Sequence, residues 1–304
     1  MIKKDIISIR DLSLNEINVI LNLAKKIKKN SPKKYLIGKI IAHCFFEPST
    51  RTRLSFETAT LQLGGHVIGF SDSECLSIKK GEDLQDTIKT ISCYADLIIL
   101  RHSFEGAARL AAEISDKPII NAGDGANQHP TQALTDLFTL KEAQGNLEGL
   151  SIALVGDLKY GRTIHSLVQL CGLFNMRLFL ISPGLLPLPE TIANELKYKG
   201  IRFSFHTHLE EVISKVDVLY MTRLQHERFT SSENQLYINQ CTLTEDKLKK
   251  AKPNLNILHP LPRGKEMDKS IDETHFALYF KQVANAVYVR QAILALILDK
   301  KFKF

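Results

Sequence analysis

Residues 39–63 read KIIAHCFFEPSTRTRLSFETATLQL, and this stretch decides the fold. Residues 39–46 are an apolar run that predicts a buried strand, and residues 54–63 have the spacing of an amphipathic helix. Between them, three hydroxyls and two guanidinium groups fall within the five residues from Ser49 to Arg53. Backbone N–H groups and the positive end of a helix dipole meet at such a turn and favour a phosphate. The stretch therefore predicts an oxyanion site, with an ordinary Ser or Thr cap beside two surface arginines as the alternative.

The composition favours a soluble globular protein of two domains. The chain has 304 residues, more than the roughly 100–200 residues of a usual single domain. Its hydrophobic content of 44% and charged content of 24% are typical of globular proteins, and no apolar run reaches the about 18 residues of a membrane span. The N-terminus lacks the features of a signal peptide, so we expect a cytoplasmic location. Five scattered cysteines without a Cys-x-x-Cys pair indicate neither a disulfide framework nor a cysteine zinc site.

The formal net charge of +7 is compatible with nucleic acid, an acidic surface or anionic small substrates as partners. Lysines cluster in residues 25–29 and 247–250, where their spacing is typical of solvated helix faces. No basic strip with interleaved aromatic residues accompanies them. Anionic small substrates are therefore the favoured partners, nucleic-acid binding is a minor alternative, and no membrane partner is expected.

Apolar runs alternate with helix-like segments along the chain, which predicts parallel sheets covered by helices on both faces. A helix with a capping-box start is expected over residues 13–29, and a long final helix over residues 282–299. The pattern restarts after Gly145, so the predicted fold class is α/β with two open, doubly wound parallel-sheet domains. The predicted strands are residues 39–46, 66–70, 95–101 and 118–123 in the first domain, and residues 151–155, 177–181, 201–205, 217–221 and 254–258 in the second.

Polar clusters follow six of these strands, at the carboxyl ends where ligands bind in open α/β sheets. The clusters carry cations, hydroxyls or imidazoles, with no competing carboxylate pair or His/Cys cluster, so the sequence predicts a site for heavily anionic ligands. Alone, each cluster would more often be a surface pair or a helix start, and their shared position at strand ends is what favours function. They comprise residues 49–52, 101–102, 121–132, 156–163, 222–225 and 259–263.

Residues 156–163 read GDLKYGRT and nearly match the P-loop pattern G-x-x-x-x-G-K-[ST]. Arg162 stands where that loop has lysine, and a planar guanidinium is not interchangeable with a compact ammonium. An NTPase also needs an acidic Mg²⁺ ligand at another strand end, whereas the strand ends above are basic or neutral. A P-loop-like nucleotide hydrolase is therefore a remote alternative.

Seven motifs in this order resemble the aspartate/ornithine carbamoyltransferase family, and within it the aspartate carbamoyltransferases. The resemblance covers nearly the whole chain and implies two domains with the active site in the cleft between them. Residues 1–131 with the C-terminal helix 287–304 would bind carbamoyl phosphate, and residues 132–286 would bind aspartate. The motifs are FEPSTRTR (46–53), KGE (80–82), RH (101–102), NAGDGANQHPTQ (121–132), VGDLKYGRT (155–163), MTRLQ (221–225) and HPLPR (259–263).

The resemblance implies transfer of the carbamoyl group of carbamoyl phosphate to the α-amine of L-aspartate, in pyrimidine biosynthesis and without a cofactor or metal. The residues implied as catalytic are Thr52, Arg101, His129 and Lys80. Those implied for carbamoyl phosphate are Ser49, Thr50, Arg51, Thr52, Ser77, Lys80, Arg101, His129, Gln132, Leu261 and Pro262. Those implied for aspartate are Lys80, Arg162, Arg223 and Gln225.

The family also implies a homotrimer in which the loop of Lys80 reaches a neighbouring subunit's site, and it leaves open a regulatory chain in a larger complex. An ornithine or other amino-acid carbamoyltransferase is the alternative. An ornithine site needs an acidic group for the side-chain ammonium, whereas Arg162, Arg223 and Arg263 would repel a cation. Residues 230–243 are expected to form a mobile loop that accompanies domain closure.

Overall fold

The apolar run of residues 39–46 forms strand β1 (Ile40–Phe45), which lies inside a four-stranded parallel sheet. Both edges of β1 are paired, because Ile41 lies opposite Val67 on one side and Leu97 on the other. The strand is buried from Ile41 onward, as an interior strand covered on both faces must be. The strand order is β2-β1-β3-β4, with β2 (His66–Phe70), β3 (Leu97–His102) and β4 (Ile119–Asp124).

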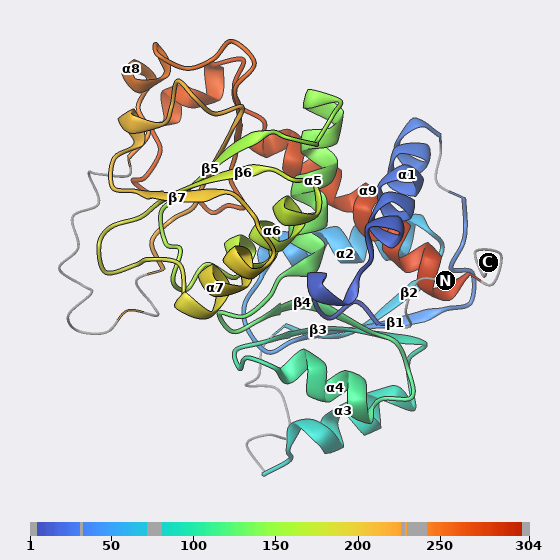
Figure 1. Ribbon diagram of the computed structural model, residues 1–304. Coiled ribbons are helices and arrows are strands. Elements are labelled where there is room, and N and C mark those ends of the chain that lie inside the picture. Colours follow the sequence, from blue (N-terminus) through green and yellow to red (C-terminus); the bar gives the residue numbers. More distant parts are fainter. Residues whose placement is uncertain (1–4, 31–32, 72–80, 226–228, 230–241, 300–304) are drawn as a thin grey trace. The chain divides into compact units, whose positions relative to one another are not determined.

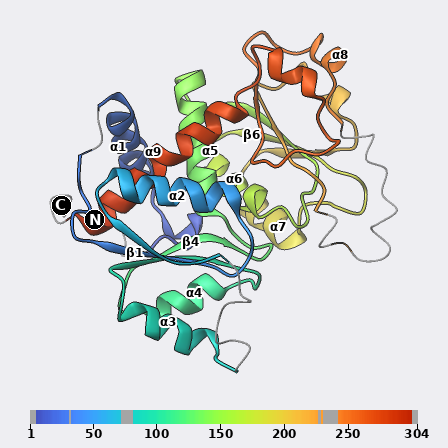
Figure 2. The same ribbon diagram turned by 180° about the vertical axis from the view of Figure 1, so that it is seen from behind.

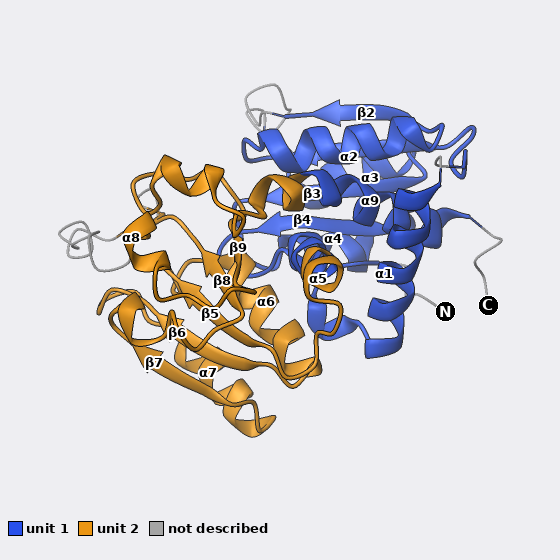
Figure 3. Ribbon diagram, turned by 90° about the horizontal axis from the view of Figure 1, so that it is seen from above, with its two compact units in different colours: residues 1–138, 284–304 blue, residues 139–283 orange. Residues whose placement is uncertain are grey.

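The computed structural model describes residues 5–30, 33–71, 81–225, 229 and 242–299. The chain divides into two units, each built on its own sheet (Figure 3). Unit 1 comprises residues 1–138 and 284–304, and unit 2 comprises residues 139–283.

Helices cover both faces of the sheet of unit 1 (Figures 1 and 2). Helices α3 and α4 lie on one face, where they bury an apolar cluster that includes Cys44, Ile88 and Leu100. Helices α1, α2 and α9 lie on the other face. The bounds are α1 (Leu14–Lys29), α2 (Thr50–Gln62), α3 (Leu84–Ser92) and α4 (Ala107–Ile114), while α5 (Pro130–Gln144) and α9 (Tyr279–Leu298) each belong to both units.

Unit 2 contains a five-stranded parallel sheet in the order β7-β6-β5-β8-β9. Its core cluster includes Val155, Met221 and Ile257 from the strands and Leu209 and Tyr279 from other elements. The strands are β5 (Ser151–Val155), β6 (Arg177–Ile181), β7 (Phe203–His206), β8 (Val218–Met221) and β9 (Asn256–Leu258). The helices are α6 (Arg162–Leu173), α7 (Glu190–Tyr198) and α8 (Glu245–Leu248), and short 3-10 helices lie at Leu209–Glu211 and Lys269–Glu273, as one does at Ile9–Asp11 in unit 1.

The predicted α/β class with two parallel sheets is confirmed, and each predicted strand is present. One helix boundary was wrong in a way that matters for function. Helix α2 begins at Thr50, four residues before the predicted start at residue 54, so Thr50, Arg51 and Thr52 lie on its first turn. The apolar periodicity starts only at Leu54, and a polar first turn gives no periodic signal. In the part of the chain that the structure describes, no helix is long and apolar enough to cross a membrane.

Candidate active site

The first turn of α2 is open to a ligand because its N-cap residue does not cap it. Ser49 has extended backbone angles, but its side chain makes no capping hydrogen bond. Ser13, by contrast, forms a complete capping box at the start of α1, in which its Oγ accepts from the Glu16 N–H at 3.2 Å. The alternative of an ordinary serine cap is therefore wrong for Ser49. A helix N-terminus without a side-chain cap, and with hydroxyls around it, is suited to a phosphate.

The two arginines of this stretch have different surroundings. Arg53 is held by its own helix, because its Nε lies 2.7 Å from Glu57 Oε1 one turn later. That ion pair compensates its charge. Arg51 is half-buried on the first turn of α2, and its place beside the N-cap makes it the better candidate for a bound anion.

Two of the predicted residues meet in unit 1, and a third is held at a strand end of the same unit. Thr52 Oγ1 on α2 lies 3.4 Å from His129 Nε2, which immediately precedes α5, and both residues are buried. Arg101 on β3 is held at the strand end, with its Nε 3.4 Å from Glu47 Oε2 and its Nη1 3.5 Å from the Ala122 carbonyl. A hydroxyl, an imidazole and a guanidinium are all suitable donors to a developing oxyanion.

A buried carboxylate shapes the loop that carries His129. Asp124 is 1% exposed and accepts hydrogen bonds from the Asn121 amide at 2.8 Å, the Gln128 N–H at 3.1 Å and the Gly106 N–H at 3.0 Å. These bonds satisfy an otherwise costly buried charge and fix the loop over residues 121–129. His129 is thereby placed by main-chain geometry at the end of β4.

In unit 2, a buried acid fills the turn that resembles a P-loop. Asp157 accepts from the Tyr160 N–H at 2.8 Å and from the Gln225 N–H at 3.3 Å. Burial raises the pKa of Asp157, and the hydrogen bonds from backbone N–H groups oppose that rise. The N–H of Tyr160, which a P-loop would offer to a phosphate, is therefore occupied by the protein's own carboxylate.

The two glycines of this turn serve close packing. A Cβ on Gly156, which has a φ of +116°, would lie 2.3 Å from the Thr222 carbonyl oxygen. A Cβ on Gly161 would lie 2.4 Å from the Asp157 carbonyl oxygen. Only glycine fits at either position. Close packing therefore explains both glycines of the P-loop-like sequence, and a bound nucleotide is not needed to explain them.

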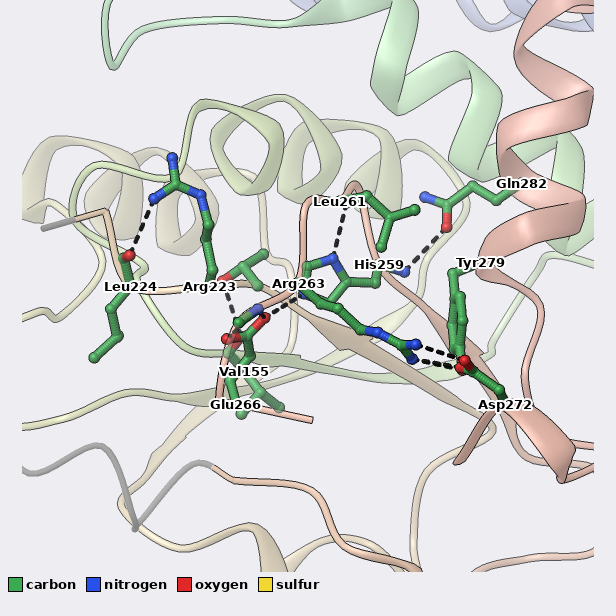
Figure 4. A network of polar contacts seen from close by, with 12 residues as sticks. Val155, Arg223, Leu224, His259, Leu261, Arg263, Glu266, Asp272, Tyr279 and Gln282 are labelled. Atoms are coloured by element: carbon green, nitrogen blue, oxygen red, sulfur yellow. Dashed lines mark hydrogen bonds and ion pairs between the residues drawn. The ribbon is translucent and has the colours of Figure 1, made fainter. Parts of the chain in front are cut away.

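The predicted aspartate-binding residues follow β5 and β8. Arg162 is the first residue of α6 and is only 8% exposed. Arg223 follows β8, and its Nη1 donates to the Leu224 carbonyl at 3.3 Å (Figure 4). Because Asp157 binds the Gln225 N–H, the turn carrying Arg162 and the segment carrying Arg223 and Gln225 are joined.

A buried histidine sets the conformation of Leu261. His259 Nδ1 accepts from the Leu261 N–H at 2.8 Å, so its other nitrogen, Nε2, carries the proton and donates to Glu266 Oε1 at 2.9 Å (Figure 4). Burial alone would raise the pKa of Glu266, but hydrogen bonds from His259 and from the Gly264 N–H lower it. Leu261 has a φ of +55°, a conformation that costs about 1–2 kcal/mol for a non-glycine residue and that the imidazole helps to hold. The peptide bond to Pro262 is cis.

Arg263 does not contribute an uncompensated charge. Both Nη atoms donate to the carboxylate of Asp272, whose Oδ1 also accepts from the hydroxyl of Tyr279 (Figure 4). The sequence-based argument that Arg263 would repel a cation is therefore weakened, and it rests on Arg162 and Arg223. Among the described residues, no group of three or more His, Cys, Asp or Glu side chains is arranged to hold a metal ion.

Family models match both halves of the chain. The carbamoyl-P binding domain of aspartate/ornithine carbamoyltransferase matches residues 4–142, and the Asp/Orn binding domain matches residues 148–297. The chain belongs to the aspartate/ornithine carbamoyltransferase family.

Three relatives that match nearly the whole of this carbamoyltransferase chain are aspartate carbamoyltransferases. The chain is 52% identical over 300 residues to the aspartate carbamoyltransferase catalytic subunit of Chromobacterium violaceum. This match covers 99% of each of the two chains. The catalytic subunit of M. jannaschii aspartate transcarbamoylase has 46% identity and a TM-score of 0.90, covering 99% of this chain and 100% of that one. Aspartate transcarbamoylase from Trypanosoma cruzi, in complex with N-(phosphonacetyl)-L-aspartic acid, has 38% identity and a TM-score of 0.91, covering 97% and 95%.

The predicted family and enzyme class of this carbamoyltransferase are therefore confirmed, and these relatives give no support to an ornithine enzyme. The roles of the individual site residues stay predictions. Ser77 and Lys80 lie outside the described residues, as does most of the expected mobile loop, residues 230–241.

Some residues that shape the site were not predicted from the sequence. Asp157 had a signal, because an acid directly after the first glycine is unexpected in a phosphate loop. Asp136 lies four residues after Gln132, and the Gln132 Nε2 donates to its Oδ1 at 2.7 Å. That spacing places both side chains on one helix face and could have suggested the pair.

Proposed function

We propose that this chain transfers the carbamoyl group of carbamoyl phosphate to the α-amine of L-aspartate, giving N-carbamoyl-L-aspartate and phosphate in pyrimidine biosynthesis. Residues 1–131 with helix 287–304 form the carbamoyl-phosphate domain, and residues 132–286 form the aspartate domain. The observation that carries the proposal most is the uncapped first turn of α2, with Thr52 beside His129. Membership of a family whose near relatives are aspartate carbamoyltransferases supports the same substrates.

Carbamoyl phosphate is held mainly by the first turn of α2. Ser49, Thr50, Arg51 and Thr52 bind the phosphate through hydroxyls, backbone N–H groups and a guanidinium, and Arg101 adds a second charge. Gln132 and the backbone around Leu261 and Pro262 hold the carbamoyl NH₂. Ser77 and Lys80 complete this set.

The chemical step requires donors fixed around the carbamoyl carbonyl oxygen. When the amine attacks, a C–N bond forms and the oxygen gains negative charge, which Thr52, Arg101 and His129 stabilise. Each such fixed donor lowers the barrier by about 3 kcal/mol. The C–O bond to phosphate then breaks, and the departing phosphate accepts the amine proton. No nucleophilic serine or cysteine takes part.

Aspartate is positioned by its two carboxylates. Arg162 and Arg223 bind them with planar, bidentate geometry, assisted by Gln225 and Lys80. Fixing both carboxylates limits rotation of the amino acid and holds its amine ready for attack, which supplies much of the rate advantage of an oriented reaction.

We place the enzyme in the cytoplasm as a homotrimer in which Lys80 serves a neighbouring subunit's site. Mixing two impaired variants, assayed at an aspartate concentration well below the wild-type KM, tests this. Lys80→Gln chains keep Arg162, and Arg162→Gln chains keep Lys80, so a mixed trimer contains sites with both residues. Random mixing should give about a quarter of wild-type activity, since each site draws the two residues from independently chosen chains. Each variant mixed with itself is the control, and mixed trimers without activity would contradict the shared site.

The experiment that tests the function is a transfer assay with the purified chain. Carbamoyl phosphate is supplied with L-aspartate, with L-ornithine or without acceptor, and ATP hydrolysis is measured in parallel. We expect carbamoylated product only with L-aspartate. Product with ornithine would overturn the assignment of Arg162 and Arg223, and ATP hydrolysis without transfer would overturn the function.

A further inference from the structure

Arg290 on α9 is a fully buried guanidinium that the mechanism above does not use. It is 1% exposed and is the largest of the fully buried side chains. Burial lowers the pKa of its guanidinium to about 9, and the nearby charge of Asp136 opposes that shift. A buried cation is unfavourable unless its partners compensate it, so its partners indicate what it does.

One arm of Arg290 reaches Ser55, which lies one turn after the start of α2. Its Nη1 donates to Ser55 Oγ, and its guanidinium lies over the ring of Phe56, 4.7 Å from the centroid. The Ser55 hydroxyl in turn donates toward the carbonyls of Arg51 and Thr52. A hydroxyl has one hydrogen and two lone pairs, so it can accept from Arg290 and donate to this backbone at the same time. Arg290 therefore holds Ser55, and Ser55 holds the turn that would bind the phosphate.

A second buried group, Asp136, holds the amide of Gln132. Asp136 is fully buried on α5, and the Gln132 Nε2 donates to its Oδ1 at 2.7 Å. An ionised carboxylate only accepts hydrogen bonds, so the amide NH₂ of Gln132 must face Asp136 and its Oε1 must face away. That orientation presents an acceptor to the carbamoyl NH₂, which is a donor.

We propose that Arg290 and Asp136 are positioning residues for carbamoyl phosphate: Arg290 fixes the first turn of α2 through Ser55, and Asp136 fixes the amide of Gln132. These two buried side chains thus set the phosphate end and the NH₂ end of the substrate site. This inference rests on the proposed function, because it needs carbamoyl phosphate as the ligand. All of its members belong to unit 1.

The structure offers a matched control on the same two helices. Gln291 Nε2 donates to Gln62 Oε1 at 2.8 Å, which joins α9 to the far end of α2. Gln291→Met removes a bond between the same helices as Ser55→Ala does, but it leaves the first turn of α2 untouched. We expect both variants to lower the thermal midpoint, and only Ser55→Ala to raise the KM for carbamoyl phosphate.

The sharpest variant is Asp136→Asn. An asparagine amide offers a donor as well as an acceptor, so it no longer forces the Gln132 NH₂ to face away from the carbamoyl NH₂. We expect the KM for carbamoyl phosphate to rise about 30-fold while the KM for aspartate stays within about 3-fold. Because Asp136 acts through Gln132, Asp136→Asn should add nothing to Gln132→Ala in the double variant. Effects that multiply would overturn the proposal.

Arg290→Lys tests the role of the charge. Lysine loses its proton about 2 pH units lower than arginine in the same surroundings, so the KM for carbamoyl phosphate should begin to rise at a correspondingly lower pH than in the wild type. A purely structural arginine would give an unshifted pH profile, which would count against the proposal.

If Arg290→Lys does not fold, Ser55→Ala and Asp136→Asn carry the test. An active wild type whose Ser55→Ala and Asp136→Asn variants both keep the KM for carbamoyl phosphate within about 2-fold would refute the positioning roles of Arg290 and Asp136. So would a Gln291→Met variant that raises that KM as much as Ser55→Ala does. A wild type without carbamoyl transfer would refute the proposed function instead, and the two failures are therefore distinguishable.

Discussion

Two turns of this chain, residues 46–52 after β1 and residues 156–162 after β5, each lead from a parallel strand into the first turn of a helix. Both helices begin without a side-chain cap, at Ser49 and at Gly161. They differ in what lies inside the turn. The carboxylate of Asp157 accepts from the Tyr160 N–H of the second turn and from the Gln225 N–H after β8, whereas Ser49 makes no side-chain capping bond in the first.

This difference shows why the sequence pattern of a loop is weak evidence for the ligand that it binds. The turn that nearly matches the P-loop pattern has its glycines packed against the Thr222 and Asp157 carbonyls, and an internal acid stands where a phosphate would be. The turn without glycines has a helix start bearing hydroxyls and Arg51. An anion site depends on where unpaired N–H groups point, which a pattern of glycines and lysines only partly reports.

The largest effect should come from Thr52→Ala in the first turn. Loss of a donor to the developing oxyanion should lower kcat by about 100- to 1000-fold and change the KM for aspartate little. Thr58→Ala, the same substitution later on α2, is the matched control and should keep wild-type kcat. If Thr52→Ala keeps full kcat in steady-state assays, the oxyanion role of this turn is wrong.

In the second turn, Arg162→Gln should weaken the binding of aspartate and leave the binding of carbamoyl phosphate unchanged. A charged hydrogen bond contributes about 1.5–3 kcal/mol, so the KM for aspartate should rise about 10- to 150-fold. Arg177→Gln, at the exposed start of β6, is the control. It also removes one positive charge from unit 2, and it should have the wild-type KM for aspartate. A higher KM for carbamoyl phosphate alone in Arg162→Gln would mean that the two turns had been assigned the wrong way round.

The smallest effect concerns the pH dependence of Asp157. Burial raises its pKa in the folded chain. The resulting stability is fully present below the unfolded value of about 3.9 and is lost as pH rises through the folded pKa. Asp157→Asn lacks this titration. The thermal midpoint of the wild type minus that of Asp157→Asn should therefore fall by a few °C from about pH 3.5 upward.

Asp86→Asn is the control for that measurement, because it removes an exposed carboxyl from α3. Its thermal midpoint should depend on pH in the same way as that of the wild type. If the difference in thermal midpoint between wild type and Asp157→Asn stays constant with pH, the pKa of Asp157 is not raised by folding.

Much of the fold was predictable because its signals are local. Continuous apolar runs identified the strands, and Ser13 with Glu16 identified the start of α1. The start of α2 was placed too late, since the polar residues Thr50–Arg53 show no periodicity until Leu54. The candidate site was predictable only as a set of strand-end residues, because parallel strands bring their carboxyl ends to one edge.

The sequence by itself determined the two parallel α/β units and the chemistry at the strand ends, since both depend on periodicity and on which residue follows which strand. Only the tertiary structure decided which groups satisfy one another. Arg290 and Ser55 are 235 positions apart, and Asp157 and Gln225 are 68 apart. Such pairs form because helices pack on sheets in a particular order, and long-range hydrogen bonds of this kind leave no pattern in the local sequence.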